Sequence, residues 1–321
     1  MPVPTLSDTL SLGPDEPLHV LVPSRALGAA VEAVSPRIRA HRVNADDGPL
    51  DGEAAQAQVW VPRDGGASVP DNGFLESVPR LRLVQLLTAG AEKFVDRLPA
   101  GVVLCNARGA HTPSTAEWVV TAILAAQRGI PFFVHEQAAG RWTSTVERSL
   151  VGARVLVVGA GDIGRTVGRM LAGFDVRLTY VARTARDGVR STDDLPDLLP
   201  DADVVVLLVP VTPETVGMVD AAFLAAMPDG ALLVNAARGV VVDTDALLAE
   251  LTSGRLRAAL DVTEPEPLPE GHPLWTAPGL LLTPHVGGAV PETNDRAAAA
   301  VTDQLARVLA GRPLVNVVDR Y

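Results

Sequence analysis

Three polar side chains in the last third of the chain could together bind an acid and move a proton. Arg238, Glu266 and His285 each follow a short apolar run of the kind that forms a buried strand. In an open α/β sheet the carboxyl ends of the strands face one ligand crevice, so we expect these side chains there. Imidazole exchanges protons near neutral pH, and guanidinium binds carboxylates. Taken alone, each of these residues is more often an ordinary loop residue. The hypothesis of an active site therefore rests on the occurrence of all three together.

A second site is indicated by the stretch VLVVGAGDIGRTVGRML, in which Gly159, Gly161 and Gly164 have the spacing G-x-G-x-x-G. This motif follows a strand pattern and opens a helix pattern, which is the context of a dinucleotide-binding turn. The first glycine permits a tight turn, the second lets the backbone approach a pyrophosphate, and the third lets the helix pack closely on the strand. Amide N–H groups at the helix N-terminus then face the anion. The sequence therefore predicts a dinucleotide cofactor.

The end of the next strand bears on which dinucleotide is bound. An acidic residue there usually holds a ribose with a free 2′-hydroxyl, but residues 180–186 read YVARTAR and contain no acid. Arg183 can bind a 2′-phosphate through charge-assisted hydrogen bonds, and Thr184 adds a hydroxyl donor. The alternative is a solvated arginine on a loop. The sequence favours NADP as cofactor and leaves NAD open.

Four segments, in this order, resemble the D-isomer-specific 2-hydroxyacid dehydrogenase family, which includes glyoxylate/hydroxypyruvate reductases and phosphoglycerate dehydrogenases. They are VGAGDIG, NAARG at 235–239, LDVTEPEP at 260–267 and TPHVGG at 283–288. The resemblance implies an oxidoreductase that transfers a hydride between NAD(P)H and a small 2-keto/2-hydroxy acid. Formate-oxidising relatives carry Gln where Glu266 stands, so hydroxy-acid chemistry is expected. A cofactor-sensing corepressor and a phosphite-type dehydrogenase remain alternatives within the same family.

The resemblance also implies roles for individual residues. His285 would act as acid/base, Glu266 would orient the imidazole and favour its charged form, and Arg238 would bind the substrate carboxylate and polarise the ketone. Backbone N–H groups at Ala89 and Gly90 would bind the same carboxylate. Asp261 is expected at the nicotinamide end. The cofactor-binding set is Gly159, Gly161, Asp162, Ile163, Gly164, Arg183, Thr184, Val209, Pro210, Ala236, Asp261 and Gly287.

Alternating apolar runs and helical segments predict an α/β fold with parallel sheets. Helices are expected at about 115–128 and 292–311. The predicted strands lie at 19–22, 58–61, 81–87, 102–105, 154–158, 176–181, 204–208, 231–235, 258–261 and 280–283. The resemblance implies two domains, with a doubly wound Rossmann cofactor domain at 108–287 inserted in a flavodoxin-like substrate domain. That outer domain takes residues 1–107 and 288–321, and the helix at 115–128 resembles the family's dimer-forming element, so a homodimer is expected.

Composition narrows the partners and the compartment. The formal net charge is −11 and the sequence has no block of Lys and Arg, which argues against nucleic acid or an anionic membrane as a partner. Cys105 is the single cysteine and lies in an apolar run, so we expect a core residue and no metal site. The opening residues to about Pro17 read as a loose arm without a secretory signal, which predicts a cytoplasmic protein. The histidines other than His285 have no comparable setting, namely His19, His41, His111, His135 and His272.

Overall fold

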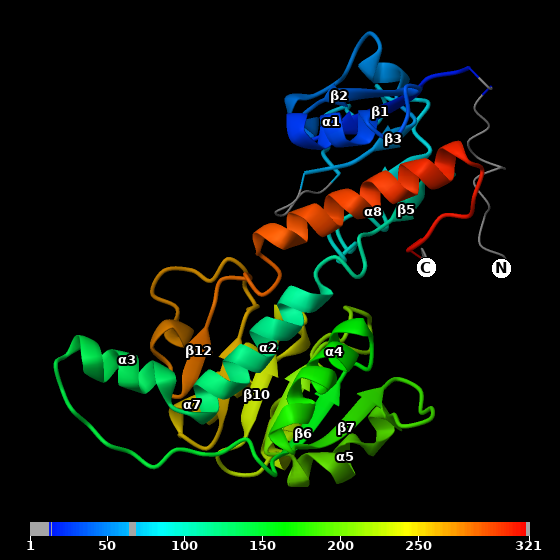
Figure 1. The fold of residues 1–321 in the computed structure, drawn as a ribbon. Coiled ribbons are helices and arrows are strands. Elements are labelled where there is room, and N and C mark those ends of the chain that lie inside the picture. Colours follow the sequence, from blue (N-terminus) through cyan, green and yellow to red (C-terminus); the bar gives the residue numbers. More distant parts are fainter. Residues whose placement is uncertain (1–12, 14, 64–68, 319–321) are drawn as a thin grey trace. The chain divides into compact units, whose positions relative to one another are not determined.

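The computed structural model describes residues 13, 15–63 and 69–318, so the predicted N-terminal arm lies almost wholly outside the described residues (Figure 1). The described chain forms two compact units. Unit 1 contains the residues up to His111 together with those from Val290 onward, and unit 2 spans Thr112–Ala289. The boundaries expected from sequence, after residues 107 and 287, fall a few residues earlier than these.

Unit 1 is built on a five-stranded parallel sheet in the order β2-β1-β3-β4-β5. With five parallel strands this order is the flavodoxin-like one, as the sequence analysis predicted. Leu18 pairs with Ile38 and Val20 pairs with Val59, so the apolar strand residues of neighbours lie side by side. The strands are β1 (Leu18–Val22), β2 (Ile38–Arg42), β3 (Val59–Trp60), β4 (Leu83–Gln85) and β5 (Val103–Cys105).

Each face of the unit 1 sheet is covered by apolar side chains. Helices α1 (Arg25–Glu32) and α8 (Pro291–Leu309) lie side by side on one face, where Val301 and Leu305 of α8 join a core with the strands (Figure 1). Trp60 and Phe74 are buried on the other face, with ring centroids 4.9 Å apart. A sheet that is buried on both faces needs continuous apolar strands, and that is how most of these strands could be predicted.

Unit 2 carries seven parallel strands in the order β12-β11-β10-β9-β6-β7-β8. The chain starts this sheet at β6, adds β7 and β8 on one side, and then crosses to add β9 to β12 on the other. The reversal leaves a topological switch point between β6 and β9, where ligands bind in doubly wound sheets. The strands are β6 (Arg154–Val158), β7 (Arg177–Ala182), β8 (Arg190–Ser191), β9 (Val204–Leu207), β10 (Leu232–Asn235), β11 (Arg257–Leu260) and β12 (Leu280–Leu282).

Helices cover both faces of the unit 2 sheet, which makes it doubly wound (Figure 1). One face packs against α2 (Thr112–Gln127) and α4 (Asp162–Leu171). The other packs against α5 (Leu195–Leu198), α6 (Ala221–Ala226) and α7 (Thr244–Thr252). Short 3-10 helices occur at Ala45–Asp47, Ala54–Gln56, Ala172–Phe174, Thr192–Asp194, Leu199–Asp201, Gly239–Val241 and Pro273–Thr276.

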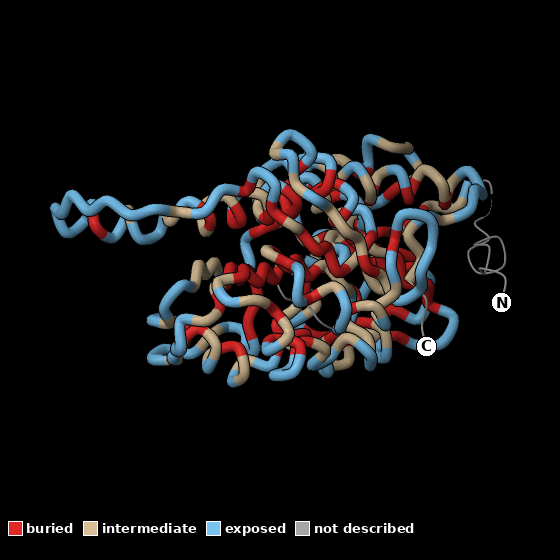
Figure 2. The backbone as a smooth tube through the Cα atoms, turned by 90° about the horizontal axis from the view of Figure 1, so that it is seen from below, coloured by how far each residue is buried: buried red, intermediate tan, exposed pale blue. Residues whose placement is uncertain are grey.

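Helix α3 (Ile130–Ala138) and the segment that follows it project from the body of unit 2 (Figure 1). The projecting segment at the left of Figure 2 is exposed along most of its length. Among the described residues, no single helix is long and apolar enough to cross a membrane. Helices α2 and α3 reach that length and hydropathy only together, and they meet at a bend of 66°.

Several elements differ from the sequence-based expectation. Strand β2 was not predicted because its sequence, IRAHR, is polar and only Ile38 is buried, as befits the edge of a sheet. Helix α2 begins at Thr112, three residues before its predicted start, and α1, α3 and β8 were not predicted. Cys105 is fully buried, as expected, and this burial raises the pKa of its thiol to about 12.

Candidate active site

Three neighbouring strands of unit 2 end in the loops that carry Arg238, Glu266 and His285. Arg238 follows β10, Glu266 follows β11 and His285 follows β12, and these strands are adjacent in the sheet. The first two loops touch through their backbones, because a Cβ added to Gly239 would lie only 1.9 Å from the carbonyl oxygen of Thr263. A glycine after Arg238 is therefore required for the loops to pack this closely.

The loop of Arg238 is shaped by a buried amide. Asn235, 1% exposed at the end of β10, accepts a hydrogen bond from the backbone N–H of Ala237 through Oδ1 (3.0 Å). Its Nδ2 donates to the carbonyl of Arg238 (3.0 Å), which closes the turn. The half-buried guanidinium donates from Nη1 to the carbonyl of Ala237 (2.7 Å). A planar guanidinium has five N–H donors and keeps its charge, so Arg238 is suited to bind a carboxylate.

The structure brings Glu266 and His285 into direct contact. The imidazole Nδ1 of His285 lies 2.7 Å from Oε1 of Glu266. The two side chains are 46% and 39% exposed, so a ligand can reach them. Because Nδ1 is engaged by the carboxylate, Nε2 is the ring nitrogen suited to exchange a proton with a substrate. A carboxylate that orients an imidazole in this way is the arrangement used in general acid–base catalysis.

Asp261 anchors the loop that carries His285. This carboxylate is 4% exposed and follows β11. Its Oδ1 accepts hydrogen bonds from Thr283 Oγ1 (2.6 Å) and from the backbone N–H of Val286 (2.8 Å). Its Oδ2 accepts from the backbone N–H of Gly287 (2.8 Å). The sequence analysis expected Asp261 only at the cofactor and missed this anchoring, although an acid at the end of a buried strand was the signal.

The backbone at His285 is in the left-handed region, with φ of +55°. A non-glycine residue rarely adopts this conformation, and it persists only where surrounding contacts hold it. Here the backbone N–H of His285 donates to the carbonyl of Asp261 (2.7 Å), in addition to the side-chain bonds of that residue. The loop thus holds the imidazole in a direction that a relaxed backbone would not give.

The glycine loop lies at the switch point between β6 and β9. A Cβ added to Gly159 (φ +119°) would lie 2.4 Å from the carbonyl oxygen of Leu208, and one added to Gly164 would lie 2.1 Å from that of Gly159. A Cβ added to Gly161 would meet no atom within 4 Å. Two glycines are therefore needed for packing, while the third leaves open space at the N-terminus of α4. These features fit the pyrophosphate of a dinucleotide.

Two arginines, Arg183 and Arg186, lie in the exposed stretch after β7. The pKa of Glu214, on the loop after β9, is lowered chiefly by a hydrogen bond from Thr212 and, to a lesser extent, by the positive charge of Arg183. Arg186 donates from Nη2 to the carbonyl of Ala160 (3.2 Å), so a second guanidinium lies against the glycine loop. The sequence analysis singled out Arg183 and Thr184 and missed Arg186, which stands in the same short stretch.

The remaining predicted residues fall on several loops. Val209 and Pro210 follow β9, Ala236 follows β10 and Gly287 follows β12, all in unit 2. Ala89 and Gly90 follow β4 in unit 1. Their loop is held by two hydrogen bonds to its carbonyls, from Asn106 Nδ2 to Ala89 (2.7 Å) and from Thr88 Oγ1 to Gly90 (3.0 Å).

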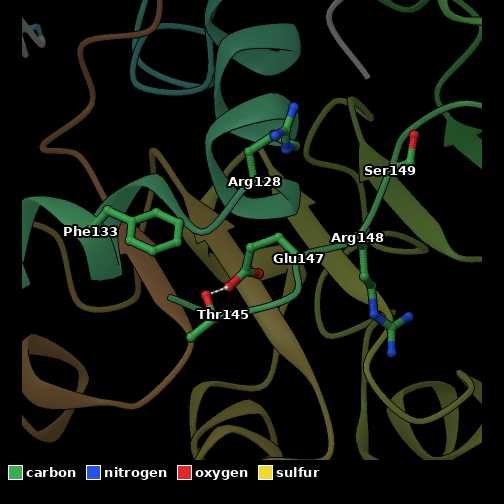
Figure 3. Close-up of a pocket in the computed structure, with 6 residues that line it drawn as sticks. All are labelled: Arg128, Phe133, Thr145, Glu147, Arg148 and Ser149. Atoms are coloured by element: carbon green, nitrogen blue, oxygen red, sulfur yellow. Dashed lines mark hydrogen bonds between the residues drawn. The ribbon is translucent and has the colours of Figure 1, made fainter. Parts of the chain in front are cut away.

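A separate cavity of about 330 Å³ opens where α2 meets α3 (Figure 3). Thr145 Oγ1 donates a hydrogen bond to Glu147 Oε1 (2.6 Å), and both residues line the cavity. None of the residues predicted for catalysis or cofactor binding lines this cavity. Its lining residues are Arg128, Phe133, Thr145, Glu147, Arg148 and Ser149.

Comparison with known proteins bears on this geometry directly. Residues 120–287 match the model of the D-isomer specific 2-hydroxyacid dehydrogenase, NAD binding domain. The chain belongs to the D-isomer specific 2-hydroxyacid dehydrogenase family. The dehydrogenase is therefore an NAD(P)-dependent oxidoreductase with a Rossmann domain, which confirms the predicted fold class and enzyme class.

Relatives of the dehydrogenase match it over most of its length. It is 34% identical over 273 residues to glyoxylate/hydroxypyruvate reductase B of Escherichia fergusonii, covering 79% of this chain and 83% of that protein. A solved D-isomer specific 2-hydroxyacid dehydrogenase from Xanthobacter autotrophicus, in complex with NADPH and MES, is 33% identical with a TM-score of 0.81, covering 95% of this chain and 98% of that one. The solved NADPH-dependent glyoxylate/hydroxypyruvate reductase of Sinorhizobium meliloti is 26% identical with a TM-score of 0.82, covering 94% and 98%.

Proposed function

We propose that this dehydrogenase reduces small 2-keto acids of the glyoxylate and hydroxypyruvate kind, with NADPH as the favoured cofactor. The observation that carries the proposal is the 2.7 Å contact between Glu266 and His285, on loops that follow neighbouring strands. The names of the relatives from E. fergusonii and S. meliloti support the substrate class.

Each residue of the site has a task in this reaction. The nicotinamide ring, when bound, supplies the hydride that the substrate carbon accepts. Arg238 orients the substrate carboxylate and polarises the ketone, and the backbone at Ala89 and Gly90 binds the same carboxylate. His285 releases a proton from Nε2 to the ketone oxygen, which completes the hydroxyl group. Glu266 stabilises the charged imidazole before this transfer.

The cofactor contacts follow from the loops of unit 2. Amide groups from Gly161, Asp162 and Ile163 at the N-terminus of α4 would hold the pyrophosphate. Arg183 and Thr184 would hold the 2′-phosphate of NADPH, and Arg186 adds a guanidinium nearby. The other proposed contacts come from Val209, Pro210, Ala236, Asp261 and Gly287.

A panel of 2-keto acids tests the proposal. The purified protein is assayed with glyoxylate, hydroxypyruvate, pyruvate and larger 2-keto acids, with NADPH and with NADH, and phosphite is tested in the oxidative direction. We expect the highest kcat/KM for glyoxylate or hydroxypyruvate with NADPH. Cofactor binding without turnover of any 2-keto acid would instead favour a cofactor-sensing protein, and turnover of phosphite alone would favour the phosphite-type reaction.

The Glu266→Gln variant is expected to shift the pH dependence of catalysis. Reduction requires a protonated His285, and a neutral amide does not favour the charged imidazole as a carboxylate does. The rate of reduction should therefore fall off at lower pH than in the parent, and the rate of oxidation should reach its plateau at lower pH. The measurement is kcat against pH in both directions, with Glu264→Gln in the same loop as the control. An unmoved profile would count against the pairing.

We also propose a homodimer in which the segment 130–151 forms the contact. Helix α2 buries Ala116, Val119 and Ile123 in the core of unit 2. The large exposed apolar side chains of this region therefore lie in the segment that follows α2. Glu136 accepts a hydrogen bond from Arg141 Nε (3.0 Å), and the Arg141 and Thr143 hydrogen bonds lower its pKa to about 2. The segment is thus internally bonded while it exposes large apolar side chains, a combination typical of an interface. These are Ile130, Phe132, Val134, Trp142, Val146 and Val151.

Light scattering checks the dimer. At micromolar concentration the parent should show the mass of two chains, and Trp142→Ser combined with Val146→Ser should shift the mass toward one chain. Arg312→Ser, an exposed change in unit 1, is the control that should stay dimeric. A monomeric mass for the parent would contradict the proposal.

A cytoplasmic location is part of the same proposal. It is supported by the single cysteine, fully buried at position 105, which provides no internal disulfide of the kind used in oxidising compartments. Fractionation of cells that express the protein, followed by detection with an antibody, tests this location.

A further inference from the structure

Three side chains that commonly bind metals meet in unit 1, where the proposed reaction uses none of them. They are His19, His41 and Glu53, and one potential ligand atom of each lies within 4.8 Å of those of the others. Among residues 13, 15–63 and 69–318, no other group of three or more His, Cys, Asp or Glu side chains comes together in this way. The sequence analysis found no such setting, because the three residues belong to separate elements.

Strand pairing brings the two histidines together. In the parallel register of β1 and β2, Leu21 pairs with His41 and His19 pairs with Arg39. His19 and His41 are thus diagonal neighbours on one face of the sheet, within reach of each other. The backbone N–H of His19 also donates to Gln58 Oε1 (2.8 Å), which fixes β1 at this point. Glu53 lies just before the 3-10 helix Ala54–Gln56, which packs against β1.

The two rings meet edge to edge. His19 Nδ1 and His41 Nε2 are 2.8 Å apart, the ring centroids are 5.1 Å apart, and the ring planes differ by 10°. The centroid separation equals the nitrogen–nitrogen distance plus the two ring radii, so the nitrogens point at each other along the line between the rings. One nitrogen donates a proton and the other accepts it, and the shared position lies between them.

A metal ion can take the place of the shared proton. Zinc binds imidazole nitrogen at about 2.0–2.1 Å, so a tetrahedral site holds two such nitrogens about 3.3 Å apart. The two nitrogens would have to separate by about 0.5 Å, and each ring would have to turn by roughly 35° so that both lone pairs point at the ion instead of at each other. The donor ring would also move its proton to its other nitrogen. Imidazole binds a metal ion in its neutral form.

We propose that His19, His41 and Glu53 form a binding site for one divalent transition-metal ion, with Zn²⁺ and Co²⁺ as suitable ions. Two imidazole nitrogens and one carboxylate oxygen are ligands that these ions accept, and water completes the fourth position. Mg²⁺ and Ca²⁺ prefer oxygen ligands and fit poorly. The ion connects β1, β2 and the segment before Ala54–Gln56, so its binding stabilises the folded state of unit 1.

The test uses full-length protein without a histidine tag, freed of metal with a chelator. Calorimetric titration with ZnCl₂ and the visible absorption of Co²⁺ should both show about one ion per chain, and Zn²⁺ but not Mg²⁺ should raise Tm. His41→Gln should abolish this binding, and Glu53→Gln should weaken it at least about tenfold. Glu53 is exposed, so its substitution threatens the fold least. His285→Gln and His135→Gln are the controls that should keep the ion.

Three results would overturn the site. They are the absence of saturable Zn²⁺ and Co²⁺ binding by the parent, unchanged affinity in a folded His41→Gln variant, and loss of the ion in His285→Gln, which would place it at the Glu266–His285 pair. If His41→Gln does not fold, Glu53→Gln decides, because undiminished affinity there excludes the proposed ligand set.

Discussion

The His285→Gln variant is expected to reduce glyoxylate or hydroxypyruvate about 10²- to 10⁴-fold more slowly than the parent, because it removes a positioned acid. Glutamine can form hydrogen bonds but has no proton to release near neutral pH. The glycine loop and the residues after β7 lie on other strands, so NADPH affinity should change little. The measurements are kcat at saturating NADPH and the NADPH Kd by fluorescence titration.

Two further variants separate chemistry from backbone strain. Position 285 has φ of +55°, a conformation that asparagine tolerates better than glutamine. His285→Asn should therefore be equally slow while retaining the parental melting temperature. His135→Gln, an exposed histidine on α3, should show the parental rate. A rate near that of the parent in either variant of His285 would exclude it as the acid.

The parent is expected to prefer NADPH over NADH by about ten- to a hundredfold in kcat/KM, because one hydrogen bond to a charged group contributes roughly 1.5–3 kcal/mol. Arg183 supplies such a bond to the 2′-phosphate. The double variant Ala182→Asp with Arg183→Ile should reverse the preference, since a carboxylate repels the phosphate and can accept from a ribose hydroxyl. The preference should also weaken at high salt, because the residues after β7 are exposed.

The assay compares kcat/KM for both cofactors with one saturating 2-keto acid. Arg190→Ile is the matched control, because Arg190 is exposed and pairs with Asp194 rather than with the glycine loop. Arg186→Ala should lower the preference for NADPH less than the double variant, since its guanidinium already donates to Ala160. Equal values, or values that favour NADH in the parent, would show that this loop does not bind a 2′-phosphate.

Much of the fold could be predicted because its strands are buried on both faces. Runs such as 154–158 and 204–208 are almost wholly apolar, and their order gave the doubly wound sheet of unit 2. Strand β2 could not be predicted in this way, because an edge strand with one buried residue has no apolar run. The early start of α2 was hidden by Pro113, which is tolerated in the first turn of a helix.

For the site residues, too, the features that are local in the sequence could be predicted, whereas those that depend on tertiary contacts could not. The glycine loop was predictable because its three glycines are close in sequence and flanked by a strand and a helix. Glu266 and His285 are 19 residues apart. The positions of their strands placed them in one crevice, but their direct pairing came from the family resemblance. The meeting of His19 with His41 depends on strand register, which no sequence spacing reveals.

Asp261 has a consequence for how the enzyme meets its ligands. Fixing the backbone of one residue costs about 1–2 kcal/mol in conformational entropy. Residues 283–287 would incur that cost with each ligand if their loop were mobile in the free enzyme. Because three hydrogen bonds hold this loop to the buried Asp261 carboxylate, the entropy cost of ordering it is incurred once, during folding. The substrate then meets an imidazole that is already oriented. The binding energy of the substrate therefore remains available to stabilise the transition state.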